Sequence, residues 1–134
     1  MCRQLSDALE YIHSNAIVYR DLKPSNIGFL STTNETPVHV KLLDFVNDYP
    51  SLSTCNRSAL SPKTNTSYDM TGLVGTMRYM APEVCLNQRY GLECDIYSWS
   101  IVAYGILTKR TPFEDMTPDM YQVMVCRGDY RPPI

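Results

Sequence analysis

Four residues of this sequence have the chemistry needed to activate a hydroxyl group beside a phosphate: Asp21, Lys23, Asn26 and Asp44. An aspartate can accept the hydrogen bond of an attacking hydroxyl, and a lysine two positions later can balance charge on a moving phosphate. An amide oxygen and a second carboxylate can bind a hard cation such as Mg²⁺. Pro24 stiffens the loop that carries the first three residues. The spacing therefore indicates a site for phosphoryl transfer to a hydroxyl.

The elements that must position these residues follow from hydrophobic periodicity. Apolar side chains spaced for one helical face predict an amphipathic helix over residues 4–14, namely Leu5, Ala8, Leu9 and Ile12. Runs 17–19 and 27–30 are rich in β-prone residues and flank the charged loop. Residues 38–42 alternate apolar and polar side chains, as a strand with one buried face does. We therefore expect a helix, then the charged loop, then a small hairpin near residues 27–43.

The second half of the chain predicts three further helices. Residues 82–86 form a short candidate that begins with proline. Residues 95–108 carry apolar groups all round, so this helix should be buried on most sides. Thr117 is a capping residue ahead of a helix over about 119–126. Residues 47–71 are polar and rich in Ser, Thr and Asn, which predicts a long loop.

Four short motifs in the same order resemble those of eukaryotic protein kinases. Residues 19–26 are similar to the catalytic loop, and residues 44–46 resemble the Asp-Phe-Gly motif. Residues 81–83 are the Ala-Pro-Glu motif unchanged, and residues 95–100 are similar to the start of the central buried helix of the family. Lys23 is typical of serine/threonine kinases. The residues of these motifs resemble those of the tyrosine-kinase-like branch of that group.

The resemblance covers nearly the whole chain and implies an α+β fold, the kinase large lobe. That lobe is mostly α-helical, with a small β-hairpin beside the catalytic loop. Residues 1–134 would be a partial kinase domain, lacking the N-terminal lobe and the last helices. Within it, the catalytic loop would span residues 19–26, the activation segment 44–83 and the central helix 95–108.

The same resemblance implies a role for each candidate residue. Asp21 would be the catalytic base, Lys23 the phosphate-facing lysine, and Asn26 and Asp44 the Mg²⁺ ligands. ATP would donate its γ-phosphate to a Ser or Thr hydroxyl of a protein substrate. Arg20 would pair with a phosphorylated loop residue, and Thr76 would contact Asp21 and Lys23. Tyr19 and Phe45 would pack together, and Asp95 would form hydrogen bonds to the catalytic-loop backbone.

Departures from the family pattern suggest a second interpretation. Val46 replaces the glycine after Asp-Phe, and valine resists the backbone turn that glycine permits. Gly28 replaces the aliphatic residue that usually supports the adenine ring, so a weaker floor for the nucleotide is expected. No glycine-rich loop is present, and Glu83 lacks the later arginine that would pair with it. The alternative is a pseudokinase or non-catalytic interaction module, and we expect the 134-residue piece alone to be inactive and marginally stable.

Composition excludes some other classes. A net charge of −2 and a pI of about 5.6 provide no basic field, so a helical DNA-binding module has no electrostatic support. Five cysteines without short metal-binding or redox spacings are typical of reduced thiols in a cytoplasmic protein. The first residues lack the apolar stretch of a signal peptide, and the apolar run 101–107 is too short to span a bilayer.

Overall fold

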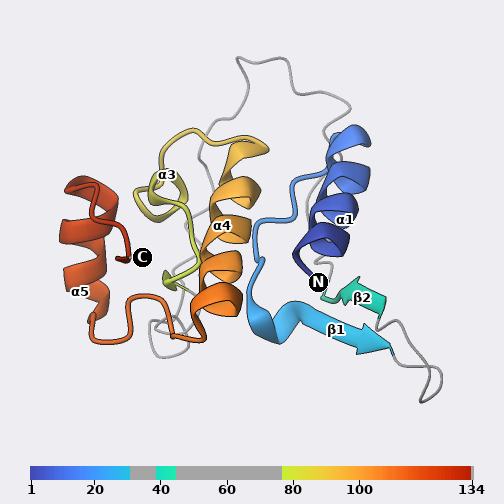
Figure 1. The fold of residues 1–134 in the computed structure, drawn as a ribbon. Coiled ribbons are helices and arrows are strands. Elements are labelled where there is room, and N and C mark those ends of the chain that lie inside the picture. The colour runs from blue at the N-terminus through green and yellow to red at the C-terminus, as the bar shows by residue number, and fades with distance from the viewer. Residues whose placement is uncertain (31–38, 45–76, 134) are drawn as a thin grey trace.

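A computed structural model describes residues 1–30, 39–44 and 77–133 (Figure 1). Its elements are, in chain order, α1 (Cys2–Ser14), η1 (Pro24–Asn26), β1 (Ile27–Leu30), β2 (His39–Leu42), α3 (Pro82–Cys85), α4 (Glu93–Thr108), α5 (Pro118–Met120) and η3 (Tyr121–Arg127). Helix α4 lies in the middle, with α1 and the hairpin on one side and α3, α5 and η3 on the other. Helices with one small antiparallel sheet agree with the predicted α+β class. No helix in these ranges has the length and apolar character needed to cross a membrane.

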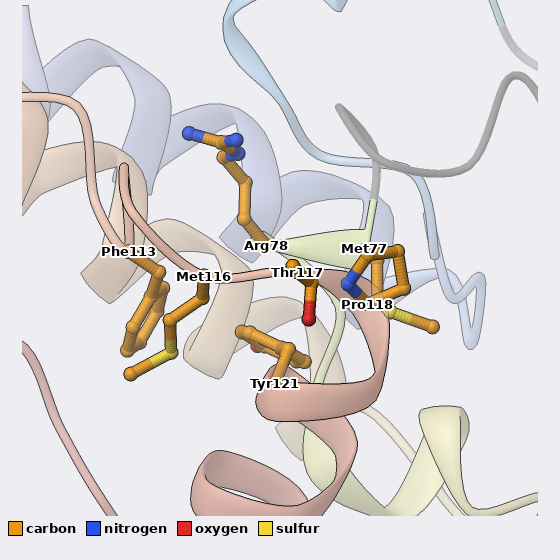
Figure 2. A pocket seen from close by; sticks show the side chains of 7 residues that line it. All are labelled: Met77, Arg78, Phe113, Met116, Thr117, Pro118 and Tyr121. Atoms are coloured by element: carbon orange, nitrogen blue, oxygen red, sulfur yellow. The ribbon is translucent and has the colours of Figure 1, made fainter.

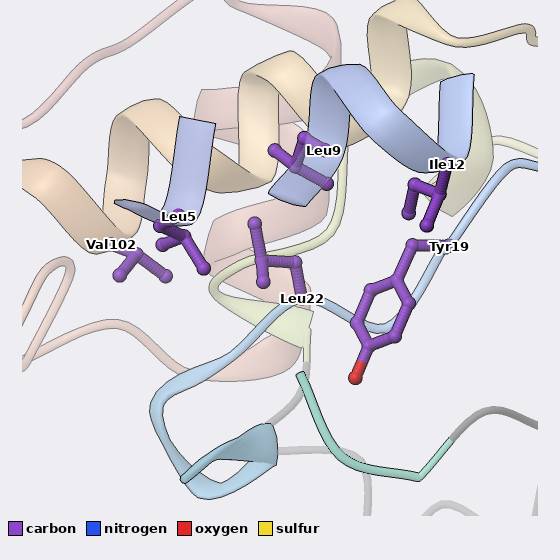
Figure 3. Packing of buried hydrophobic residues seen from close by; sticks show 6 residues of the cluster. All are labelled: Leu5, Leu9, Ile12, Tyr19, Leu22 and Val102. Carbon is purple, nitrogen blue, oxygen red and sulfur yellow. The ribbon is translucent and has the colours of Figure 1, made fainter. Parts of the chain in front are cut away.

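The predicted N-terminal helix is confirmed as α1, which begins two residues earlier than expected. Its apolar stripe is buried, and it forms one core with residues of the charged loop 19–26 and of α4 (Figure 3): Leu5, Leu9, Ile12, Tyr19, Leu22 and Val102. Each fully buried aliphatic side chain stabilises the fold by about 1.5–3 kcal/mol. The same cluster therefore holds α1, the charged loop 19–26 and α4 together.

The predicted hairpin is confirmed in the described residues. β1 and β2 pair antiparallel, with Ile27 opposite Leu42 and Gly28 opposite Lys41. Side chains alternate between the two faces of a strand. Accordingly, Ile27, Val40 and Leu42 pack against the first core, whereas Lys41 is exposed. Position 38, the first residue of the predicted strand, lies outside the described residues.

The β-prone run 17–19 is not a strand, so that expectation was wrong. The backbone N–H groups of Tyr19 and Arg20 donate to the carboxylate of Asp95 instead of to a neighbouring strand. Arg20 also has a φ of 68°, which is incompatible with an extended strand. The carboxylate of Asp95 in α4 therefore accepts the hydrogen bonds that a neighbouring strand would otherwise accept.

Helix α4 is buried on two faces, and the prediction of a buried central helix is only partly right. Val102 contacts the first core, and Ile101 belongs to a second core with Phe113, Tyr121 and Val125. The side chain of Leu107 is exposed. The helix begins two residues before the predicted start and ends at a left-handed residue, with a φ of 56°.

The other two predicted helices are also present. Pro82 begins α3, as expected from its fixed φ. Thr117 caps α5 by accepting a hydrogen bond of 3.3 Å from the backbone N–H of Met120. The helix then continues as the π-helical turns of η3, so it spans more than the predicted 119–126. Helices α3 and η3 pack together beside the second core.

Candidate functional site

A short turn sets the geometry of the charged loop 19–26. Leu22 is almost completely buried in the first core and anchors the loop between the two functional side chains beside it. Pro24 starts the 3₁₀ turn η1, and the N–H of Asn26 donates to the carbonyl oxygen of Lys23 at 3.0 Å. This turn returns the chain toward Asp21 within five residues.

Three of the predicted site residues form one hydrogen-bonded cluster. The Oδ2 atom of Asp21 accepts hydrogen bonds from Nζ of Lys23 at 2.7 Å and from Nδ2 of Asn26 at 2.9 Å. Nδ2 of Asn26 also donates to the backbone oxygen of Asp21 at 2.9 Å. Asn26 is buried, whereas Asp21 and Lys23 are partly exposed. The structure thus holds the amide rigidly and leaves the acid and the lysine accessible to a ligand.

Asp44 lies two residues beyond the end of β2, and hydrogen bonds join the backbone before it to Asn26 and Tyr19. The residue before it, Leu43, donates its N–H to the backbone oxygen of Asn26 at 2.8 Å. The hydroxyl of Tyr19 donates to the backbone oxygen of Leu43. Asp44 has a φ of 57°, in the left-handed region that aspartate tolerates better than most residues. Two hydrogen bonds therefore position the backbone immediately before Asp44.

The pKa of Tyr19 is affected by both Asp21 and Asp44. Its pKa is raised to about 12, first by burial and then by the charges of Asp21 and Asp44, while a hydrogen bond with the side chain of Asn26 lowers it. A phenol resists ionisation when it is desolvated and when negative charges are near. Both carboxylates and the amide therefore lie within electrostatic or hydrogen-bonding reach of one hydroxyl.

The oxygen ligands at this site suit a magnesium ion. Asn26 commits its amide nitrogen to Asp21, so the carbonyl oxygen Oδ1 is the atom it would offer to a cation. Asp44 would add a carboxylate. Among residues 1–30, 39–44 and 77–133, no group of three or more His, Cys, Asp or Glu side chains is placed to hold a metal ion. Proteins often hold Mg²⁺ through one or two side chains, water and substrate phosphates. Binding of one ion by Asn26 and Asp44 stays a prediction.

A buried carboxylate binds the backbone at the start of the charged loop 19–26. Asp95 in α4 is fully buried and accepts hydrogen bonds of 2.7 Å from the N–H groups of Tyr19 and Arg20. The contact that the family resemblance implied for Asp95 is therefore present. Nε2 of His13 lies 2.8 Å from the same carboxylate. No local sequence pattern indicates that His13 belongs to this arrangement, because the two residues are 82 positions apart.

Other supporting residues are only partly described. The guanidinium of Arg20 donates to the hydroxyl of Tyr90 at 3.2 Å. Its predicted phosphorylated partner falls in the loop outside the described residues, as do Thr76, Phe45 and Val46. The placement of Tyr19 in the first core agrees with the packing role inferred for it.

A small pocket lies on the other side of α4, between residues 77–78 and the start of α5 (Figure 2). Arg78 spans its edge and donates to the backbone oxygen of Pro112 at 3.3 Å. The remaining lining is mostly apolar: Met77, Phe113, Met116, Pro118 and Tyr121, with Thr117. None of the four predicted site residues lines this pocket, so it is separate from the acid–lysine–amide cluster.

Comparison with known proteins adds independent evidence. Residues 1–130 match the family model described as the protein kinase domain. The chain is 40% identical over 112 residues to serine/threonine-protein kinase Pkn1 of Myxococcus xanthus, covering 84% of this chain and 15% of that protein. It is 36% identical over 126 residues to serine/threonine-protein kinase STY46 of Arabidopsis thaliana, covering 94% and 19%.

A third relative is serine/threonine/tyrosine-protein kinase HT1 of Arabidopsis thaliana, with 33% identity over 130 residues that cover 97% of this chain and 29% of the relative. The chain therefore spans less than a third of the length of each of these relatives.

Proposed function

The chain belongs to the eukaryotic protein kinase family, and from this premise we propose that it contributes the catalytic lobe of a serine/threonine kinase of the tyrosine-kinase-like branch. The protein that contains it would transfer the γ-phosphate of ATP to Ser or Thr hydroxyls of protein substrates. The observation that supports this most strongly is the cluster in which Asp21 binds both Lys23 and Asn26. That cluster brings a carboxylate, an ammonium group and an amide together, which supports the proposed roles of base, phosphate-facing cation and metal ligand.

In this proposal Asp21 orients the acceptor hydroxyl and accepts its proton. A carboxylate has about four lone-pair sites, so Asp21 can bind a hydroxyl while it retains bonds to Lys23 and Asn26. The ammonium group of Lys23 has three N–H donors. It can therefore keep its bond of 2.7 Å to Asp21 and also donate to a phosphate oxygen. This arrangement links the hydroxyl and the phosphate through one ion pair.

Asn26 and Asp44 are the residues that would hold Mg²⁺. The ion would neutralise phosphate charge and align the phosphates of ATP. The role of the chain is to keep the two ligands in place: Asn26 through its bonds to Asp21, and Asp44 through the backbone contacts of Leu43. Both ligands are thus positioned by groups that need not move when the nucleotide binds.

The test uses the full-length protein that carries this chain, because the chain spans less than a third of the length of the relatives named above. Asp21→Asn should leave Mg²⁺-dependent ATP binding within about threefold of wild type and lower the phosphorylation rate about 10²–10⁴-fold, the usual contribution of a catalytic base. Asp44→Ala should abolish Mg²⁺-dependent ATP binding. Calorimetric titration and transfer of labelled phosphate to a generic protein substrate measure the two effects.

A pseudokinase is the second candidate, and Gly28 is the structural observation that favours it. This glycine contributes no side chain of its own to β1 beside the proposed nucleotide site. If the wild-type protein binds no ATP in the presence of Mg²⁺ and transfers no phosphate, the catalytic proposal is wrong and the non-catalytic interpretation stands.

A further inference from the structure

Two cysteines that lie far apart in the sequence meet where α3 packs against η3. Cys85 is the last residue of α3, and Cys126 lies near the end of η3. The two helices are in contact, and a hydrogen bond joins the two cysteine side chains. The sulfur atoms therefore lie next to each other, although no short spacing in the sequence indicates a redox pair.

A second contact fixes α3 relative to η3. The hydroxyl of Tyr121, the first residue of η3, donates to the backbone oxygen of Met80 at 3.0 Å. Met80 and Tyr121 each lie five positions before one of the two cysteines. Cys126 also packs against the second core, which includes Tyr121. Both cysteines are thus carried by segments that are already joined to each other and to the core.

The pKa of Tyr121 responds to both cysteines. Burial is the largest cause that raises this pKa, followed by Tyr97 and then by the charges of Cys126 and Cys85. A negative charge raises the pKa of a phenol in this way only from a short distance. The phenol of Tyr121 therefore lies near both sulfur atoms, which agrees with the hydrogen bond between them.

The surroundings of the two thiols suit them to different parts in an oxidation. Burial and the hydrogen bond with Cys85 raise the pKa of Cys126 to about 12, so Cys126 remains a thiol at neutral pH. Oxidants react with the thiolate form, so Cys126 is not the first to react. Cys85 is half-buried, which leaves its sulfur open to a small molecule. Cys94 is only 2% exposed and is closed to such a molecule.

We propose that Cys85 and Cys126 form a dithiol site that hydrogen peroxide oxidises to a disulfide, joining α3 to η3 by a covalent bond. The inference goes beyond the proposed kinase function and does not depend on it. Oxidation would be reversible, because a dithiol reductant can cleave the bond by exchange. In the reduced protein the same residues contribute only a hydrogen bond.

The reaction has two steps. The sulfur of Cys85 attacks the peroxide, a S–O bond forms while the O–O bond breaks, and the departing hydroxide takes the thiol proton and leaves as water. The sulfur of Cys126 then attacks the sulfenic acid of Cys85. A S–S bond forms, the S–O bond breaks, and the hydroxyl leaves as a second water with the proton of Cys126. The two sulfurs lose two electrons in total, and these reduce the peroxide to water.

Peptide mapping of the full-length protein tests which cysteines are linked. The folded protein is treated with hydrogen peroxide at low protein concentration, its remaining thiols are alkylated, and it is digested with trypsin, which cleaves after lysine and arginine. Cys85, Cys94 and Cys126 then fall in three separate peptides, 79–89, 90–109 and 111–127. We expect mass spectrometry to find the first and third peptides linked and the second alkylated. Dithiothreitol should separate the linked pair.

The melting temperature supplies a second readout, because a disulfide formed in the folded state restricts the unfolded chain. Oxidation should raise the melting temperature of the wild type by at least about 4 °C, and dithiothreitol should reverse the rise. Cys126→Ser should lose both the link and the rise. Cys85→Ser should give the same result and replaces Cys126→Ser if that variant folds poorly. Cys2→Ser is the matched control, because Cys2 is also half-buried but lies in α1, and it should retain both effects.

Three outcomes would overturn the proposal. The first is a peroxide-treated wild type in which both cysteines are alkylated or further oxidised without a link. The second is a link from Cys85 to any cysteine other than Cys126. The third is a linked pair with no rise in melting temperature, since the bond would then have formed from an opened state. A protein that forms the predicted link but binds no ATP would contradict the proposed kinase function and leave the dithiol site standing.

Discussion

The buried carboxylate of Asp95 and the backbone N–H of Tyr19 are joined by a hydrogen bond of 2.7 Å across 76 positions of sequence. The same carboxylate accepts a second bond of 2.7 Å from the next residue, Arg20. Asp95 belongs to α4, the helix that also contributes Val102 to the core around Leu22. The loop that carries Asp21 is therefore positioned from below by one rigid helix.

Removing the Asp95 carboxylate should destabilise the protein. Asp95→Ala leaves the buried N–H of Tyr19, the partly buried N–H of Arg20 and His13 without their acceptor, so we expect the free energy of unfolding to fall by about 2–4 kcal/mol. Urea denaturation measures the change. Glu93→Ala, on the exposed side of the same helix, should change stability by less than about 0.5 kcal/mol. Equal effects of the two substitutions would contradict the positioning role of Asp95.

The buried amide of Asn26 should contribute more than an exposed amide that makes a comparable bond. Asn26→Ala removes bonds to the backbone and the carboxylate of Asp21 and should cost about 1–3 kcal/mol. Asn15 donates to the backbone oxygen of Tyr11 at 2.8 Å but is exposed, so Asn15→Ala should cost about 0.5–1 kcal/mol. Denaturation curves for both variants make the comparison. A larger loss for Asn15→Ala would show that burial of Asn26 is unimportant.

Stability should fall in alkaline solution. Burial is the largest cause that raises the pKa of Cys94 from 9.0 and of Tyr19 from 10.0, each to about 12. Both groups are neutral when protonated, so above pH 9 the unfolded chain releases protons that the folded chain retains. Their stabilising contribution is complete below pH 9 and is lost as the pH rises toward about 12.

Urea denaturation between pH 8 and pH 11 tests this effect, which for each group is at most about 1.4 kcal/mol per pH unit. Tyr19→Phe removes the phenol but retains the ring in the core, so its stability should decline less steeply between pH 10 and pH 11. It also loses the hydrogen bond to Leu43, which lowers stability at neutral pH. A wild-type stability that is constant from pH 8 to pH 11 would refute the assignment.

The cap of α5 should be replaceable by another hydroxyl. Thr117 accepts a hydrogen bond of 3.3 Å from the N–H of Met120, and loss of such a cap costs about 1 kcal/mol. Thr117→Ala should lower the free energy of unfolding by that amount, while Thr117→Ser should restore most of it. Thr111→Ala, at an exposed residue of the preceding loop, serves as the control. If serine is no better than alanine, the hydroxyl does not act as the cap.

The sequence alone predicted the local elements well, because each depends on interactions between near neighbours. The periodicity of residues 4–14 predicted α1, the alternation around Val40 predicted β2, and Thr117 marked the start of α5. The motif around Asp21 predicted the family, which the match over residues 1–130 confirms. Spacing within one short loop was also sufficient to place Lys23 and Asn26 beside Asp21.

Tertiary structure decided the contacts between distant parts of the chain. The run 17–19 has the composition of a strand, yet the N–H of Tyr19 donates to the carboxylate of Asp95 and so does not pair with another strand. The proximity of His13 to Asp95 and of Leu43 to Gly28 depends on how helices and strands pack, and no local pattern encodes either contact. Sequence determined which side chains were available, since composition and spacing are local. Packing determined which of them meet, because burial joins residues without regard to their separation along the chain.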